Sequence, residues 1–155
     1  MIIPESYDWR KDHEECVQTP KSVSRDCYSA YVDLTVSVAE DKICMGNNGN
    51  PLRLSSQEVL DCDRTSNGCD GGSCNRVITW GKKRGFVPET CYPNTGKQGE
   101  CPDDHLIENT CRQTNNFYRV IDFCLATEVT GIKKEIMTNG PVIGQLTPNT
   151  DFLTY

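Results

Sequence analysis

The sequence is poor in histidine, in clustered basic residues and in long apolar runs. Of its 155 residues only 2 are histidine, and the formal net charge is -6. No stretch approaches the roughly 20 consecutive apolar residues that a membrane-spanning helix needs, so we predict no membrane span. Nucleic-acid binding requires clustered Lys and Arg. The basic run from Lys82 to Arg84 is typical of a solvated helix end, so we expect no nucleic-acid partner.

Closely spaced cysteine pairs are also missing, although cysteine itself is abundant. The chain has 10 cysteines, and none of them forms the Cys-x-x-Cys pair that structural zinc sites usually contain. We therefore predict disulfides, no metal and no cofactor. Disulfides indicate an oxidising environment, such as the secretory pathway, a lysosome-like vesicle or the cell exterior. The first residues lack the features of a signal peptide, so we expect a mature or trimmed form.

The spacing of apolar residues predicts helices in the first part of the chain. A helix over 29–43 is expected to bury two stripes, one formed by Val32, Val36, Ala39 and Ile43 and the other by Tyr31, Leu34 and Val38. Ser55 and Glu58 fit a capping box, in which Ser55 caps a second helix and Glu58 reaches back to it. A third helix is expected over 74–83, ended by Gly85. Further along, we predict strands over 118–125 and 141–146, with a short helix over 132–138 between them.

Several separated motifs resemble those of the papain-like cysteine proteases, and of cathepsin B in particular. They are Pro4 to Arg10, Cys27 with Ser29, Glu40 to Cys44, Ser55 to Cys62, Gly68 to Gly72, and Asn139 to Val142 followed by Asp151 to Leu153. The resemblance implies an α+β chain with the papain-like cysteine proteinase fold. We expect a complete, disulfide-rich helical left lobe over 1–111, with an irregular cysteine-rich segment over 88–116. Residues 117–155 would then be the start of a right-lobe β-barrel that is only partly present.

The same resemblance implies that the catalytic residues are missing. It places Ala30 where the family has its reactive cysteine, and Ser24 where it has its oxyanion glutamine. A methyl group cannot attack a peptide carbonyl. The family's catalytic His and Asn follow the Asp-Phe-Leu segment, and this sequence ends at Tyr155 before either of them. His13 and His105 match neither, and we expect both to be solvated surface histidines. The chain is therefore predicted to be a pseudoenzyme.

The resemblance also implies partners for the cysteines. The expected disulfides are Cys27–Cys69, Cys16–Cys44, Cys62–Cys101 and Cys91–Cys111. The two remaining cysteines, Cys74 and Cys124, are expected to form a fifth bridge, although sequence alone does not decide connectivity.

Gly71 and Gly72 are the expected remnant of a substrate-binding surface. They match glycines whose backbone pairs with substrate in the family, and glycine suits the close approach of another backbone. An equally weighted alternative is that these glycines only shape a turn beside Cys69.

Three functions follow from these observations. The first is a structural or binding subunit of a larger assembly, in which other protein chains cover the unpaired edges of the incomplete right lobe and a peptide can occupy the former cleft. The second is a cysteine-type endopeptidase with Cys27 as its thiol and its missing residues supplied elsewhere. That alignment adds three residues within a buried helix, which rotates the following stripe by about 300 degrees. The third is a decoy that binds peptides or protease inhibitors without cutting them.

Overall fold

The computed structural model describes residues 2–21, 26–102, 111–112, 115–147 and 149–154. The regular elements of this part of the chain are helices. In order, its elements are α1 (Trp9–Asp12), the 3-10 helix η1 (Glu14–Cys16), α2 (Ala30–Gly46), α3 (Ser56–Cys62), η2 (Gly68–Asp70), α4 (Cys74–Lys83), α6 (Val129–Asn139) and η4 (Phe152–Thr154).

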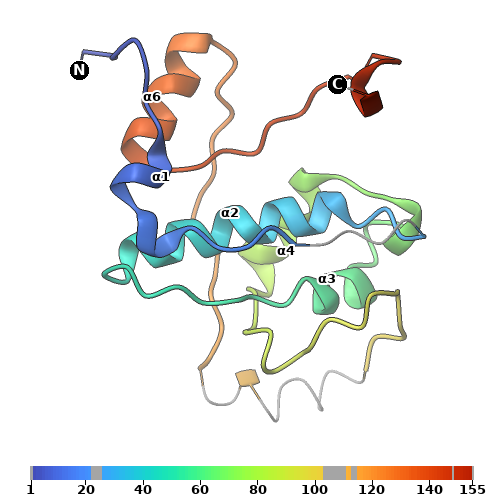
Figure 1. Cartoon of the computed structure of the whole chain (residues 1–155). Helices are drawn as coiled ribbons and strands as arrows, with labels where there is room; N and C mark the ends of the chain where they lie inside the picture. The colour runs from blue at the N-terminus through green and yellow to red at the C-terminus, as the bar shows by residue number, and fades with distance from the viewer. Residues whose placement is uncertain (1, 22–25, 103–110, 113–114, 148, 155) are drawn as a thin grey trace.

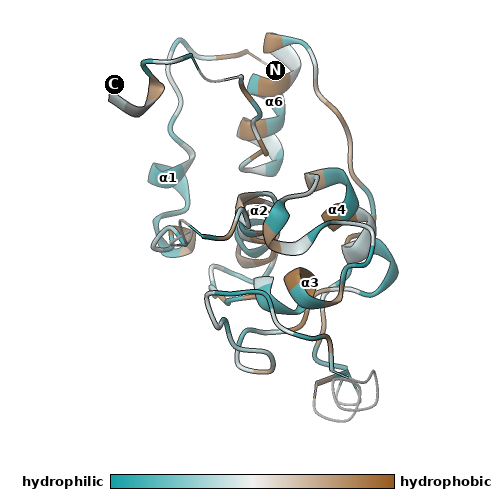
Figure 2. Cartoon of the chain, turned by 90° about the vertical axis from the view of Figure 1, so that its right-hand side faces the viewer, coloured by the Kyte–Doolittle hydropathy of each residue, from teal (hydrophilic) through white to brown (hydrophobic). Residues whose placement is uncertain are grey.

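The long helix α2 is the central element, and α3 and α4 pack against it. In both views α3 lies on one side of α2, while α1 and α6 lie on the opposite side (Figures 1 and 2). The main core fills the space between α2, α3, α4 and the segment that follows α4. Its most deeply buried side chains are Val32, Val36, Leu54, Val59, Val77 and Phe86.

The burial of α2 confirms one predicted stripe and part of the other, in which Tyr31 is buried as predicted. Val32 and Val36 are fully buried, and Ala39 and Ile43 pack against them. In the second stripe, however, Leu34 is 51% exposed. Polar side chains are buried instead, among them Asp33 and Glu40, because each has a polar partner within the fold. Asp33 accepts from Ser29, one turn earlier, and Glu40 accepts from the distant Leu54 N–H; hydrophobic periodicity reveals neither partner.

The predicted capping box at the start of α3 forms only in part. The Glu58 backbone N–H donates to Ser55 Oγ at 3.0 Å, as expected of an N-cap. Glu58 does not reach back to Ser55, because its Oε1 accepts from Arg112 Nη2 at 2.7 Å. The Ser55 N–H donates to the Val87 carbonyl instead. A long-range ion pair has therefore replaced the local half of the motif.

Four disulfides link the described cysteines, and they are the pairs that the resemblance implied: Cys16–Cys44, Cys27–Cys69, Cys62–Cys101 and Cys91–Cys111. The expected fifth bridge is wrong, because Cys74 and Cys124 are free. Cys74 begins α4, whereas the segment that carries Cys124 meets α4 at Gly81, through the Val120 N–H. Lys82 Nζ also lies 3.4 Å from Asp122 Oδ1, so this segment contacts the end of α4 opposite to Cys74.

The two predicted strands do not form ladders in the described part of the chain. Residues 118–125 contribute a single isolated bridge, between Phe86 and Tyr118, and residues 141–146 contribute none. A strand needs a neighbouring strand to pair with, and neither segment has one among the described residues. The helix predicted over 132–138 is longer, Val129–Asn139, and ends at Gly140 with a φ of 86°. The division into lobes at residues 111 and 117 stays a prediction.

The C-terminal helix α6 is attached to the rest of the chain by a second, smaller core. Trp9, Cys16 and Cys44 form this cluster, and Ile136 of α6 packs against it. Lys42 of α2 also donates to the Asn139 carbonyl at 2.7 Å. Within the residues that the structure describes, no helix has the length and apolar character needed to cross a bilayer.

Candidate functional site

The start of α2 carries the residue predicted to replace a nucleophile. Ala30 is the first residue of the helix and is exposed. Ser29 occupies the N-cap position, but its hydroxyl caps no backbone amide and donates to Asp33 Oδ2 at 2.7 Å. The exposed position at the helix start therefore presents a methyl group, which has no nucleophilic or acid–base chemistry.

The neighbouring sulfur, at Cys27, is held in a disulfide with Cys69. Cys27 is 3% exposed, and the Tyr28 N–H donates to the Cys69 carbonyl at 2.9 Å. These bonds fix residues 27–28 against η2. A thiolate is required for nucleophilic attack by cysteine, and a disulfide sulfur offers none.

The other residues considered for catalysis in the sequence analysis are not found at the start of α2 among the described residues. Ser24 and His105 lie outside the described residues. His13 lies between α1 and η1, where its ring stacks on Trp9 with 5.2 Å between centroids and its Nδ1 lies 3.8 Å from Glu15. This histidine therefore packs on Trp9, a member of the smaller core cluster, and not at the start of α2.

The two glycines of the predicted substrate surface have different roles. Gly71 has a φ of 106°, which favours glycine, and its carbonyl accepts from the Asn67 N–H in the turn. Gly72 lies against the Tyr31 ring, so that a Cβ there would come within 2.4 Å of Tyr31 Cε2. The backbone of Gly72 is exposed and, among the described residues, has no hydrogen-bond partner. Gly72 thus combines a packing constraint with a backbone open to pairing.

A pocket opens between the start of α2, α3 and the loop that follows Tyr92. Cys27, Ser29 and Asp33 line it from one side, Ser56, Gln57 and Leu60 from α3, and Asn94 and Gly96 from the loop. Asp33 is only 6% exposed. The pocket depends on three separated segments of the chain, so no local pattern predicted it.

The loop wall of this pocket is fixed by Gln57. Its Nε2 donates to the Lys97 carbonyl at 2.8 Å and to Asp61 Oδ1 at 2.9 Å, and its Oε1 accepts from the Thr95 N–H at 2.9 Å. The Tyr92 hydroxyl donates to Asp61 Oδ2 at 2.9 Å. Burial, with the hydrogen bond and charge of Asp61, raises the pKa of Tyr92. This side of the pocket is therefore a satisfied network that holds its shape.

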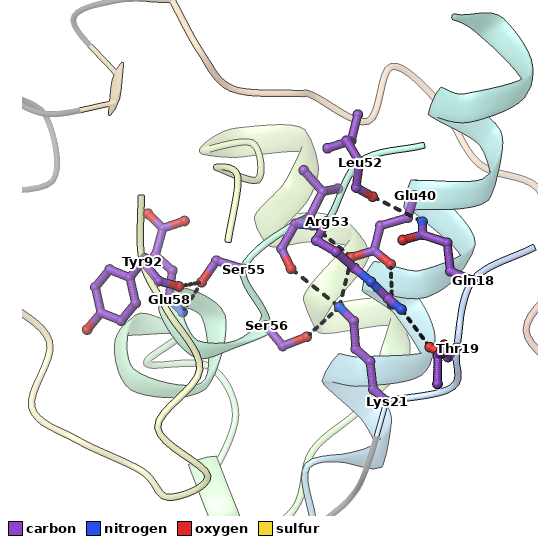
Figure 3. A network of polar contacts seen from close by, with 11 residues as sticks. Gln18, Thr19, Lys21, Glu40, Leu52, Arg53, Ser55, Ser56, Glu58 and Tyr92 are labelled. Carbon is purple, nitrogen blue, oxygen red and sulfur yellow. Dashed lines mark hydrogen bonds and ion pairs between the residues drawn. The ribbon is translucent and has the colours of Figure 1, made fainter. Parts of the chain in front are cut away.

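A buried carboxylate anchors the start of α3, as Figure 3 shows. Glu40 of α2 is 1% exposed, and its Oε1 accepts from Lys21 Nζ at 2.9 Å and from the Leu54 N–H at 2.7 Å. Its Oε2 accepts from Arg53 Nη1 at 3.3 Å. Lys21 also donates to Ser56 Oγ at 3.1 Å. Glu40 thereby ties the segment before the site and the start of α3 to the central helix.

The model of the "Papain family cysteine protease" family matches residues 3–155. The chain belongs to the papain family. Within that family it is cathepsin B-like: it is 26% identical to a cathepsin B of Dictyostelium discoideum over 99% of this chain and 54% of the relative. It is also 30% identical to the tubulointerstitial nephritis antigen of Homo sapiens, over 84% of this chain and 32% of that protein.

The solved structures agree with this family assignment. The proform of the Amb a 11 cysteine protease, a ragweed pollen allergen, matches with a TM-score of 0.56 and 31% identity, over 71% of this chain and 33% of that one. A cysteine protease of Carica candamarcensis in complex with E-64 matches with a TM-score of 0.53 and 35% identity, over 64% of this chain and 45% of that one. The papain-like fold is thus present in this chain, which spans about half the length of the cathepsin B relatives, 54% and 52%.

Proposed function

We propose that this papain-family chain is a pseudoprotease, which acts as a structural or binding subunit of a larger protein assembly. The observation that carries the proposal is the pair of positions at the start of α2. Ala30 provides no thiol, and the sulfur of Cys27 is bonded to Cys69. Peptide hydrolysis by this family's chemistry needs a thiolate with a neighbouring imidazole and donors for the oxyanion.

The replacement of the oxyanion glutamine by Ser24 adds to this proposal. Loss of one oxyanion donor typically costs about 2.7 to 4 kcal/mol of transition-state stabilisation. Even with a thiol restored at position 30, the chain would therefore lack an oxyanion donor and be a poor peptidase.

The proposed role in an assembly is supported by the apolar side chains exposed on the C-terminal half. They are Ile121, Phe123, Leu125, Val129, Leu146 and Phe152. Residues 119–128 and 141–147 are irregular and have no strand partner in the described chain. Apolar residues beside unpaired backbone favour covering by another polypeptide. We propose other protein chains as that cover.

The location that fits these features is an oxidising one, because four disulfides would not persist among cytosolic reductants. We therefore place the protein in the secretory pathway, in a lysosome-like vesicle or outside the cell.

A decoy is the second candidate, and the open backbone of Gly72 favours it. A peptide or an inhibitor could pair with this backbone without being cut. Affinity for cystatin-like inhibitors separates the two candidates, because a purely structural subunit has no reason to retain it. The remaining alternative, an endopeptidase using Cys27, would first require reduction of the Cys27–Cys69 bond.

Fluorogenic peptide substrates of papain-like enzymes test the proposed inactivity. We expect no hydrolysis by the disulfide-intact chain at mildly acidic or neutral pH, with and without mild reductant. Hydrolysis that is abolished by Cys27→Ser would contradict the proposal and support the endopeptidase. Equal background rates in the chain and in Cys27→Ser would support it.

A further inference from the structure

The pocket at the start of α2 contains a nearly buried carboxylate, that of Asp33, which has no cationic partner among the described residues. Asp33 is 6% exposed, and within the described chain the hydrogen bond to its carboxylate comes from Ser29 Oγ. A hydroxyl carries no positive charge. Burial of a carboxylate costs free energy unless a cation or several donors approach it. Asp33 lies in the first turn of α2 and is one of the residues that line the pocket.

One basic side chain, Lys21, reaches the wall of the pocket, but its charge is already paired with Glu40. Lys21 Nζ donates to Ser56 Oγ, which lines the pocket, but it lies 2.9 Å from Glu40 Oε1 and so its charge is balanced. Asp61, behind Gln57, accepts from the uncharged Tyr92 hydroxyl, the Gln57 amide and the Gly99 N–H. Among the described residues, neither Asp33 nor Asp61 is therefore paired with a cationic side chain.

The walls of the pocket restrict the kind of cation. One carboxylate does not supply the several oxygen ligands that a divalent metal ion requires. Beside the carboxylate are apolar surfaces, namely Leu60 and the Cys27–Cys69 bridge. The Gln57 amide has all of its hydrogens engaged elsewhere and is a fixed wall. An ammonium group on a short alkyl chain matches this combination, since the charge meets Asp33 while the methylenes contact the apolar walls.

We propose that the pocket formed by Ser29, Asp33, Ser56 and Leu60 binds an alkylammonium group, either a free amine or a lysine side chain of another polypeptide. This site is independent of the loss of catalysis, because it uses neither residue 30 nor a thiol. If the pocket binds no amine, the proposed loss of peptidase activity is unaffected. If the chain proves to be an active peptidase, the proposed amine site is unaffected.

Titration followed by amide NMR of the disulfide-intact chain tests the site at constant ionic strength. The probes are n-butylammonium, tetramethylammonium, a blocked tripeptide with a central lysine, and the same peptide with that lysine acetylated. We expect saturable shifts in residues 27–33, 56–60 and 94–96 with at least one primary ammonium probe. Tetramethylammonium lacks N–H donors and is expected to give no saturable shift, as is the acetylated peptide.

Asp33→Asn is the matched variant, since it keeps the shape and an acceptor for Ser29 but removes the charge. We expect its affinity for the ammonium probe to be about tenfold lower, the usual scale of a charge-assisted hydrogen bond. Butylammonium binding alone supports a free amine as ligand, and binding of the lysine peptide supports a protein partner. Absence of saturable shifts with both primary ammonium probes overturns the proposal, as does equal binding of tetramethylammonium. The probe comparison in the unmodified chain decides the question if Asp33→Asn does not fold.

Discussion

The Tyr31 ring packs directly against the backbone of Gly72, and its hydroxyl donates to the Gly68 carbonyl at 3.0 Å. One side chain of α2 thus fixes the position of the loop that carries the former substrate surface. The exposed backbone of Gly72 is consequently held in place by a packed ring and not by a loop hydrogen bond.

Gly72→Ala is expected to lower the free energy of unfolding by about 1–3 kcal/mol, the usual cost of overpacking. The added Cβ would lie 2.4 Å from the Tyr31 ring, so the ring or the loop must move. Urea denaturation measures this change. Gly144→Ala is the control, because no atom lies within 4 Å of a Cβ there, and its effect should stay within about 0.5 kcal/mol. Equal stability of the two variants would contradict the packing described for Tyr31.

The double variant Cys27→Ser/Cys69→Ser is expected to lose about 4 kcal/mol of stability. The bridge closes 42 residues of chain, and its removal restores that loop's entropy to the unfolded state. Denaturation without reductant gives the value. Cys124→Ser is the control, since that thiol is free and exposed, and its stability should match that of the parent chain.

Glu40→Gln is expected to destabilise the chain by about 3 kcal/mol, because two cationic partners lose a buried counter-charge. The loss should persist at high salt, since buried pairs are poorly screened. Glu14→Gln offers a surface comparison. A loss that disappears in high salt would indicate that Glu40 is more open to solvent than the structure shows.

Asp41 provides a prediction about pH. Desolvation, together with the charge of Glu40, raises the pKa of Asp41 from 3.8 to about 6 in the folded chain. A carboxyl with a raised pKa adds stability when protonated, fully below about pH 4, and this contribution is lost as the pH rises through about 6. Asp41→Asn should therefore stabilise the chain by about 1 kcal/mol at neutral pH, a value reduced for solvent screening, and by nothing near pH 4. A gain that is equal at both pH values would contradict the raised pKa.

Local patterns predicted the helical half of the fold well and the rest poorly. The helix over Cys74–Lys83 has the predicted bounds, because Gly85 with its positive φ marks its end. Leu34 was placed in the core by periodicity but is exposed, whereas Glu40 is buried because it bonds the Leu54 N–H, a partner that local sequence does not specify. Strands at 118–125 and 141–146 were predicted from composition, yet a ladder depends on a neighbour that local sequence does not specify. The pocket at Asp33 arises from three segments brought together, and so only the structure reveals it.

The central claim is that no sulfur is available for catalysis at the start of α2. Its most direct test is incubation of the disulfide-intact chain with E-64, followed by intact mass measurement and peptide mapping. We predict that Cys27 is recovered in a bridge with Cys69 and that no E-64 adduct forms on residues 26–33; Cys74→Ser and Cys124→Ser variants account for labelling of the two free thiols. A stoichiometric E-64 adduct on Cys27 would contradict the account.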